Sequence, residues 1–248
     1  LVTVVDKMYW PSAAITFEHD NKLMLNSYVE SGYKPVPITE KNKHAIELFL
    51  AHIKNMLSDE KEQTILLDWR AYVVQNAGKR INWAILLQGA QGTGKSYFAK
   101  VLEWLLGSNA KSLDPSALGE RFTGWAHGAV VNIVEEIRIK GDDKWRIMDR
   151  LKPFITNSMI QIEEKGRDHR TIPNFTNYLL LTNYKDALPI TNDDRRFCVM
   201  YGRIQNEQEL FDFFGGREQT ADYFENLFAE SEKHAGVIKG FLLKYNIS

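Results

Sequence analysis

Hydrophobic spacing divides the chain into three stretches of different character. Over residues 42–57 and 60–77, apolar residues recur at helical intervals and predict two amphipathic helices, behind a mixed stretch of short strands and loops. Short continuous apolar runs then alternate with helical patterns, and such runs are typical of parallel strands buried on both faces. From Glu207 the spacing is helical again. The pattern predicts an α/β protein with an N-terminal region containing a helical subdomain, a core and a C-terminal helical segment, at residues 1–78, 79–205 and 206–248.

The core contains four apolar runs that we predict as buried strands, at residues 83–87, 129–134, 177–182 and 197–201. Helical patterns separate these runs, at residues 95–106 and 143–155. Two more strands are predicted around a polar tip, at residues 159–164 and 170–175. Because strands alternate with helices, we expect a central parallel sheet.

Composition narrows the class of protein only slightly. The chain has 248 residues, 44% of them hydrophobic, and its formal net charge of −1 means that any nucleic-acid contact must come from a local basic patch. Its single cysteine, Cys198, excludes an intrachain disulfide. No apolar stretch is long enough for a bilayer and no signal-peptide pattern is present, so we expect a cytoplasmic protein (in the host cell if phage-encoded) without a membrane partner. Because the chain begins at Leu1, we expect it to be part of a larger protein.

A glycine-rich segment follows the first apolar run of the core and precedes a helical pattern. It matches the phosphate-loop motif at every fixed position, with the sequence Gly89-Ala90-Gln91-Gly92-Thr93-Gly94-Lys95-Ser96. Glycines let backbone amides turn toward phosphate oxygens, and the following helix directs its positive end at the anion. Lys95 would contact the β- and γ-phosphates and Ser96 would offer its hydroxyl to magnesium. This motif predicts a site for ATP and Mg²⁺.

The second apolar run ends in two carboxylates, Glu135 and Glu136. A buried strand that ends in acids provides one carboxylate for the magnesium shell and one for the attacking water. We assign Glu135 to the metal and Glu136 to the water, although the reverse assignment is open. The alternative is a strand ending in two solvated glutamates. The position of the pair one crossover after Lys95 favours the catalytic interpretation.

The third apolar run ends in an amide, Asn183. If this strand neighbours the acidic one, Asn183 would lie beside the carboxylates and could orient water or sense the γ-phosphate. A lone asparagine at a strand end is more often a turn residue.

The order of these motifs resembles that of the superfamily 3 helicases of viruses, phages and plasmids, especially the helicase part of phage primase–polymerase and primase–helicase proteins. The residues that carry the resemblance are Trp83–Gly89 and Leu151–Asn183, and it extends over roughly residues 60–200. It implies a P-loop NTPase with a modified AAA+ core, a hexameric ring, ATP-driven movement along single-stranded DNA and an attached primase or polymerase domain. Many relatives carry Asp-Glu where this chain has Glu135-Glu136.

Residues 138–170 form a basic segment, with nine basic residues against six acidic ones. The basic residues are Arg138, Lys140, Lys144, Arg146, Arg150, Lys152, Lys165, Arg167 and Arg170. In superfamily 3 proteins a hairpin before the asparagine carries cations into the pore, and the positions similar to that tip are Lys165, Gly166, Arg167 and His169. There they would bind DNA phosphates without reading sequence, with Lys165 leading. The alternative is a solvated hairpin face.

Two arginines precede the last apolar run, Arg195 and Arg196. They resemble the arginine finger of superfamily 3, which reaches the phosphates bound by the neighbouring subunit, and we place Arg196 slightly ahead. The alternative is a surface Asp–Arg pair of little energetic value. The expected function is an ATP-dependent DNA helicase or translocase of viral or phage replication. The competing interpretation is a P-loop ATPase that acts as a non-unwinding initiator, switch or packaging module, and a small-molecule kinase is less favoured because no lid is evident.

Overall fold

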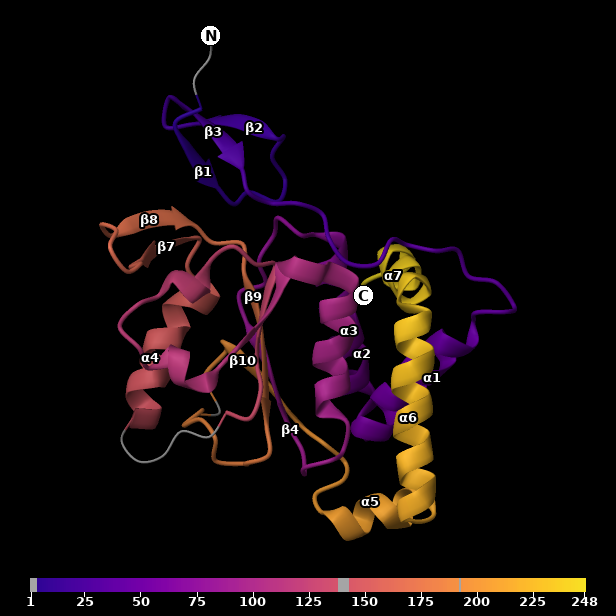
Figure 1. The fold of residues 1–248 in the computed structure, drawn as a ribbon. Coiled ribbons are helices and arrows are strands. Elements are labelled where there is room, and N and C mark those ends of the chain that lie inside the picture. Colours follow the sequence, from indigo (N-terminus) through magenta and orange to yellow (C-terminus); the bar gives the residue numbers. More distant parts are fainter. Residues whose placement is uncertain (1–3, 138–142, 192) are drawn as a thin grey trace.

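The computed structural model describes residues 4–137, 143–191 and 193–248, and a five-stranded parallel sheet lies at its centre (Figure 1). In spatial order its strands are β10 (Phe197–Tyr201), β4 (Ala84–Gln88), β9 (Asn177–Thr182), β6 (Val131–Val134) and β5 (Ala110–Leu113). Every neighbouring pair is parallel. The predicted α/β class and central parallel sheet are confirmed. All five strands therefore present their carboxyl ends at one edge of the sheet, which we call the carboxyl edge, and their amino ends at the opposite, amino edge.

The sheet is buried because helices cover both of its faces. Alternate side chains pack into two separate clusters, so that Ile85 and Leu87 of β4 face one layer of helices while Leu86 faces the other. Every residue of β4 and of β9 is buried. The continuous apolar runs of the sequence arise from this two-sided burial, since neither face meets water.

The first layer joins helices from the two ends of the chain. It contains α1 (His44–Met56), α2 (Glu60–Gln75), α3 (Lys95–Leu106), α6 (Arg217–Lys233) and α7 (Ala235–Lys244). Helix α1 contacts α6 and α7, and α2 contacts α7. The short helix α5 (Glu207–Phe214) contacts α6 and lies beyond the carboxyl edge (Figure 1). The N-terminal and C-terminal helical stretches thus form one layer against the sheet.

The second layer is formed by α4 (Asp143–Thr156) and the antiparallel hairpin of β7 (Met159–Ile162) and β8 (Arg170–Pro173). The predicted pair of strands around a polar tip is confirmed. Because only three residues separate the end of β8 from the start of β9, the hairpin is attached at the amino edge of the sheet. Figure 1 shows it at the end of the molecule away from α5.

A three-stranded sheet precedes the helices and lies next to the hairpin (Figure 1). It contains β1 (Asp6–Met8), β2 (Thr16–His19) and β3 (Lys22–Asn26), with β3 in the middle. Strand β1 pairs with β3 in parallel and β2 pairs with it in antiparallel fashion. The Trp10 ring contacts the Phe175 ring at 5.4 Å between centroids, and the Tyr9 hydroxyl donates to Asn109 Oδ1 at 2.9 Å. These contacts fix the small sheet to the core. None of the described helices is long and apolar enough to cross a membrane.

Candidate functional site

The glycine-rich segment forms the turn between β4 and α3, at the carboxyl edge. Gly92 and Gly94 have φ angles of +81° and +88°, which L-residues rarely adopt, and Gly94 caps the first turn of α3. A Cβ at Gly94 would lie 2.5 Å from Cε1 of His52. Backbone conformation and packing therefore both require glycine at this position. The turn aims the N-terminus of a twelve-residue helix at the space above the sheet edge.

Lys95 is buried against the loop that precedes it. Its Nζ donates to the carbonyl oxygens of Gly89 at 2.8 Å and Ala90 at 2.6 Å. Burial lowers the pKa of Lys95 to about 8, and the nearby Glu136 and Glu135 oppose that shift. Two neutral carbonyls are weak partners for a cation that has lost most of its hydration. An anion entering the loop would be a stronger partner, which makes the loop suited to phosphate.

Glu135 and Glu136 lie where β6 ends, held between two points of attachment to β9. Val134 is in register with Leu180, and the Ile137 N–H donates to the Leu181 carbonyl at 3.1 Å. Within this short span Glu136 has a φ of +55°, in the left-handed region. Non-glycine residues adopt it at a cost of order 1–3 kcal/mol, and such strain is concentrated at functional sites. Glu135 is half-buried and Glu136 is exposed.

Asn183 follows β9, and β9 lies between β4 and β6. The role predicted for Asn183 required its strand to neighbour the strand that ends in Glu135 and Glu136, and β9 does pair with β6. A pocket of about 230 Å³ is lined by the loop together with Glu135, Glu136 and Asn183, and by Phe224 and Phe228 of α6. The loop, the acids and the amide thus share one cavity, although they are separated by up to 94 residues along the chain.

Sequence reasoning missed a buried hydrogen-bonded group behind the loop. Because the Gly94 carbonyl can only accept, His52 donates to it from Nε2 (3.2 Å) and accepts from the Tyr223 hydroxyl at Nδ1 (3.0 Å). Asn55 in turn donates to that hydroxyl at 3.1 Å. Burial lowers the pKa of His52 to about 4, so the ring stays neutral. The only sequence signal was a histidine among the apolar positions of a predicted helix.

The residues present fit a magnesium ion. No group of three or more His, Cys, Asp or Glu side chains that could hold a metal gathers in the part of the chain that is described. Magnesium in nucleotide sites needs fewer protein ligands, because water and phosphate oxygens complete its shell. The Ser96 hydroxyl and the Glu135 carboxylate, which line the same pocket, are oxygen donors of the suitable kind.

The hairpin tip lies far from this pocket, on the amino edge. Glu164 binds Arg170 at 2.6 Å and Arg167 at 3.5 Å, and the neighbouring Glu163 lies 3.6 Å from His169. Lys165 is exposed and has no ion pair or hydrogen bond to another described residue. Arg138 and Lys140 of the basic segment lie outside the described residues. Of the predicted DNA-binding side chains, Lys165 is therefore the one most available to an anion.

The two arginines also lie at the amino edge, because Phe197 pairs with Ala84 at the start of β4. Arg196 Nη1 contacts Asp194 Oδ1 at 3.3 Å, and the Asp194 side chain is only 8% exposed. Arg195 is exposed and makes no such contact with the described part of the chain. This geometry favours Arg195, where the sequence had favoured Arg196. At about 3.3 Å per residue the length of β4 separates both arginines from Lys95, so neither is placed to act on its own loop.

Comparisons with known proteins match this chain over part or nearly all of its length. A family of unknown function, DUF5906, matches residues 87–196, a span that contains the phosphate loop, Glu135, Glu136, Asn183 and the hairpin but not Phe224 and Phe228 of the pocket. The DNA primase-polymerase of Nitratiruptor phage NrS-1 is 23% identical over 238 residues, which cover 94% of this chain and 31% of that protein. The chain thus spans about a third of the length of this relative.

Solved structures of the NrS-1 C-terminal region, in its apo form, share the fold. One superposes with a TM-score of 0.76 at 21% identity, covering 98% of this chain and 55% of that one. Another gives 0.72 over the same shares. At this level of identity the match establishes the fold and not the chemistry of the site. It does, however, include the small N-terminal sheet and the C-terminal helices along with the central sheet, since almost all of this chain is covered.

Proposed function

We propose that this protein is an ATP-dependent DNA helicase or translocase of phage replication, which hydrolyses ATP at the interfaces of a ring. The observation that carries the proposal is the single pocket shared by the phosphate loop, Glu135, Glu136 and Asn183. The strand order supports it, since β9 inserts an amide between the loop on β4 and the acids on β6. We propose accordingly that the core is that of a P-loop NTPase of the modified AAA+ kind.

The side chains around the pocket divide the chemistry of hydrolysis among them. Loop amides and Lys95 bind the β- and γ-phosphates, and Ser96 and Glu135 would hold magnesium. When bound, magnesium supplies charge neutralisation at the phosphate oxygens. Glu136 accepts the proton of the attacking water as the bond from the γ-phosphorus to its bridging oxygen breaks, leaving ADP and phosphate. Asn183 orients that water.

The remaining catalytic charge comes from a second subunit. Arg195 is exposed at the amino edge, where a neighbouring subunit can approach it. An arginine supplied in trans stabilises the charge of the transition state and contributes on the order of 10³–10⁵ in rate. The proposed assembly is a hexameric ring of the superfamily 3 kind, in which each pocket is completed by the next copy.

Single-stranded DNA is the proposed partner, and the exposed Lys165 at the hairpin tip is the first residue to contact its backbone. Similarity to a phage protein named DNA primase-polymerase supports a role in replication. Because this chain spans about a third of that relative, we propose that a primase or polymerase domain accompanies it in the full-length protein.

The test is the ATPase rate with and without single-stranded DNA, measured across a range of protein concentrations. We expect DNA to stimulate turnover and specific activity to rise with concentration, as subunits complete each other's pockets. The Lys95→Ala variant is the matched background control. ATPase that responds to neither DNA nor concentration would favour the non-unwinding module and overturn the translocase.

A further inference from the structure

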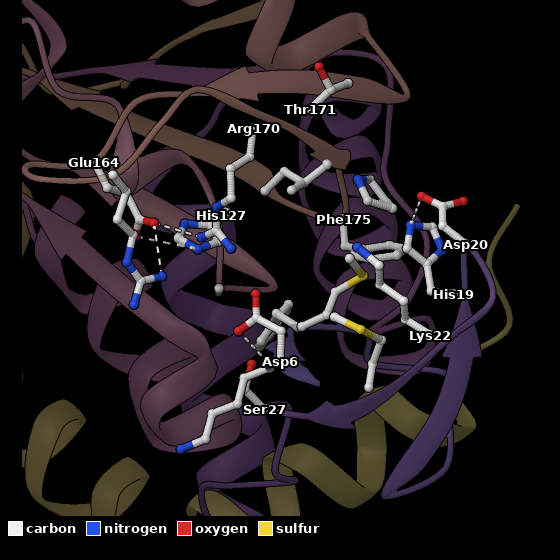
Figure 2. Close-up of a pocket in the computed structure, with 18 of the residues that line it drawn as sticks. Asp6, His19, Asp20, Lys22, Ser27, His127, Glu164, Arg170, Thr171 and Phe175 are labelled. Atoms are coloured by element: carbon white, nitrogen blue, oxygen red, sulfur yellow. Dashed lines mark hydrogen bonds and ion pairs between the residues drawn. The ribbon is translucent and has the colours of Figure 1, made fainter. Parts of the chain in front are cut away.

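A second cavity, of about 490 Å³, lies at the amino edge between the small sheet and the hairpin (Figure 2). One wall comes from β1, β3 and the turn between β2 and β3, and the other from β8 and the residues that lead into β9. Its volume is within the range of about 300–1,000 Å³ that is usual for ligand sites. None of the residues of the nucleotide pocket contributes to it.

The charges around this cavity leave two cations without partners. Of its three acids, Glu164 binds Arg170 at 2.6 Å, Asp20 lies 3.5 Å from His19, and Asp6 accepts a hydrogen bond from the Lys7 backbone N–H at 2.7 Å. Lys7 and Lys22, in contrast, are exposed, and their ammonium groups have no hydrogen bond or ion pair within the described ranges. With neutral histidines, the four cations of the lining (Lys7, Lys22, Arg167 and Arg170) exceed its three acids (Asp6, Asp20 and Glu164) by one, and the two cations without an ion pair belong to the small sheet.

The cavity also has an apolar surface next to those cations. Met8, Met24 and Phe175 line it, and the Phe175 ring packs at a tilt against Trp10, with 5.4 Å between ring centroids. Figure 2 shows Phe175, which comes from the second wall, near Lys22 of the first wall, with Arg170 on the opposite side of the view. A half-buried aromatic ring beside unpaired cations suits a ligand that has both a planar apolar part and a negative backbone.

We infer that this cavity binds single-stranded DNA, with backbone phosphates at Lys7 and Lys22 and a base packed against Phe175. The inference rests on the proposed function for the arrival of DNA at the hairpin, and adds the small sheet as a second wall of its path. The hairpin carries Lys165 at its tip, and the neighbouring Arg167 and the strand residue Arg170 line the cavity, so DNA bound at the tip would lie next to the cavity. Contacts of this kind recognise the backbone and stacking surface of DNA and not its sequence.

The test is binding of a fluorescently labelled oligo(dT) strand by anisotropy, over a series of salt concentrations. The double variant Lys7→Ala/Lys22→Ala is compared with Lys54→Ala/Lys61→Ala, which removes the same charge from exposed sites on α1 and α2 outside both cavities. Two lost phosphate contacts lower the salt slope by about 1.4 and the affinity near 0.15 M salt by about tenfold. The control variant retains wild-type affinity.

A second variant tests the contact with the DNA base while keeping an apolar side chain packed against Trp10. Phe175→Leu keeps an apolar side chain there but removes the stacking surface, and we expect binding to weaken at least fivefold with an unchanged salt slope. Thermal unfolding checks that each variant is folded.

The outcomes separate this inference from the proposed function. If Lys165→Ala weakens DNA binding while the Lys7/Lys22 and Phe175 variants bind as wild type, the cavity is not part of the DNA path and the inference is wrong, yet the translocase stands. If the protein binds no single-stranded DNA and its ATPase ignores DNA, both fail. Loss of affinity in the Lys7/Lys22 variant alone, with the control unaffected, supports the inference.

Discussion

The left-handed backbone of Glu136 allows its contribution to stability to be separated from its contribution to chemistry. Its φ of +55° is imposed from both sides, by the Val134–Leu180 register and by the Ile137 hydrogen bond to Leu181. The side chain itself is exposed, so its removal opens no cavity. Replacing Glu136 by glycine, alanine or glutamine changes backbone freedom and carboxylate chemistry in different combinations.

The magnitudes follow from backbone energetics. Relief of the left-handed conformation contributes on the order of 1–2 kcal/mol when glycine replaces an L-residue. The greater freedom of glycine in the unfolded chain costs about 0.5–1 kcal/mol. The net expectation is that Glu136→Gly is more stable than Glu136→Ala by roughly 0.5–1 kcal/mol, or about 2 °C in melting temperature for a chain of this size. Glu136→Gln and Glu136→Ala keep the strain and should match the wild type.

The ATPase rates of these variants should not follow their stabilities. If Glu136 accepts the proton of the attacking water, all three variants lose at least a hundredfold in ATPase rate, whatever their stability. Thermal and urea unfolding measure the first effect, and steady-state phosphate release measures the second. A Glu136→Gly protein no more stable than Glu136→Ala would show that the backbone is not strained. Wild-type turnover in Glu136→Gln would remove Glu136 from the chemistry.

Three further predictions test the site and its surroundings. Lys95→Ala should abolish ATP hydrolysis, and turnover at the wild-type rate would withdraw the phosphate-loop assignment. Mixing Arg195→Ala subunits with Lys95→Ala subunits should restore part of the ATPase, because the first kind keeps an intact pocket and the second keeps the arginine. No restoration would argue against a site shared between subunits. Arg196→Ala alone should retain more activity than Arg195→Ala. The pKa of His52 is about 4 in the folded protein, against an ordinary 6.5. Below pH 6.5 the unfolded state therefore binds a proton that the folded state does not, and the free energy of unfolding falls, by about 2 kcal/mol at pH 5. Urea titrations at pH 7.5 and 5 should show this loss in the wild type and a smaller one in His52→Gln; equal losses would contradict the neutral buried ring.

The sequence predicted most of the central fold, because its strands and helices have strong local patterns. The predicted strands at residues 177–182 and 197–201 and the helix at 95–106 coincide with β9, β10 and α3. Strand β5 was not predicted, since Lys111 and Ser112 interrupt its apolar pattern at an edge where one side is open. The spatial order of the strands could not be derived either, because it depends on pairings between distant segments. The division into three regions stays a prediction, since α1 and α2 share one hydrophobic cluster with α3 and the sheet.

In the candidate site, too, the sequence predicted the features that depend on neighbouring residues and missed those that depend on distant contacts. The phosphate loop was visible because its geometry is encoded in eight consecutive residues. His52 and Phe224 were not, since each reaches Gly94 only through the packing of α1 and α6, and their spacing is that of any buried helix face. Arg195 and Arg196 are adjacent and chemically identical, so only the contact with Asp194 separates them.

The separation of charges between the two edges of the sheet has a consequence for regulation. Lys95, Glu135 and Glu136 are at the carboxyl edge, whereas Arg195, Lys165 and the second cavity are at the amino edge. On the proposed mechanism, a subunit would therefore bind ATP away from its own Arg195, and it would bind DNA a full strand length from its own nucleotide. In a ring the amino edge of one copy can face the pocket of the next. DNA bound at the hairpin would then stabilise the placement of Arg195 in the neighbouring pocket and not in its own. Stimulation of ATPase by DNA should accordingly disappear in Arg195→Ala, while DNA affinity is retained.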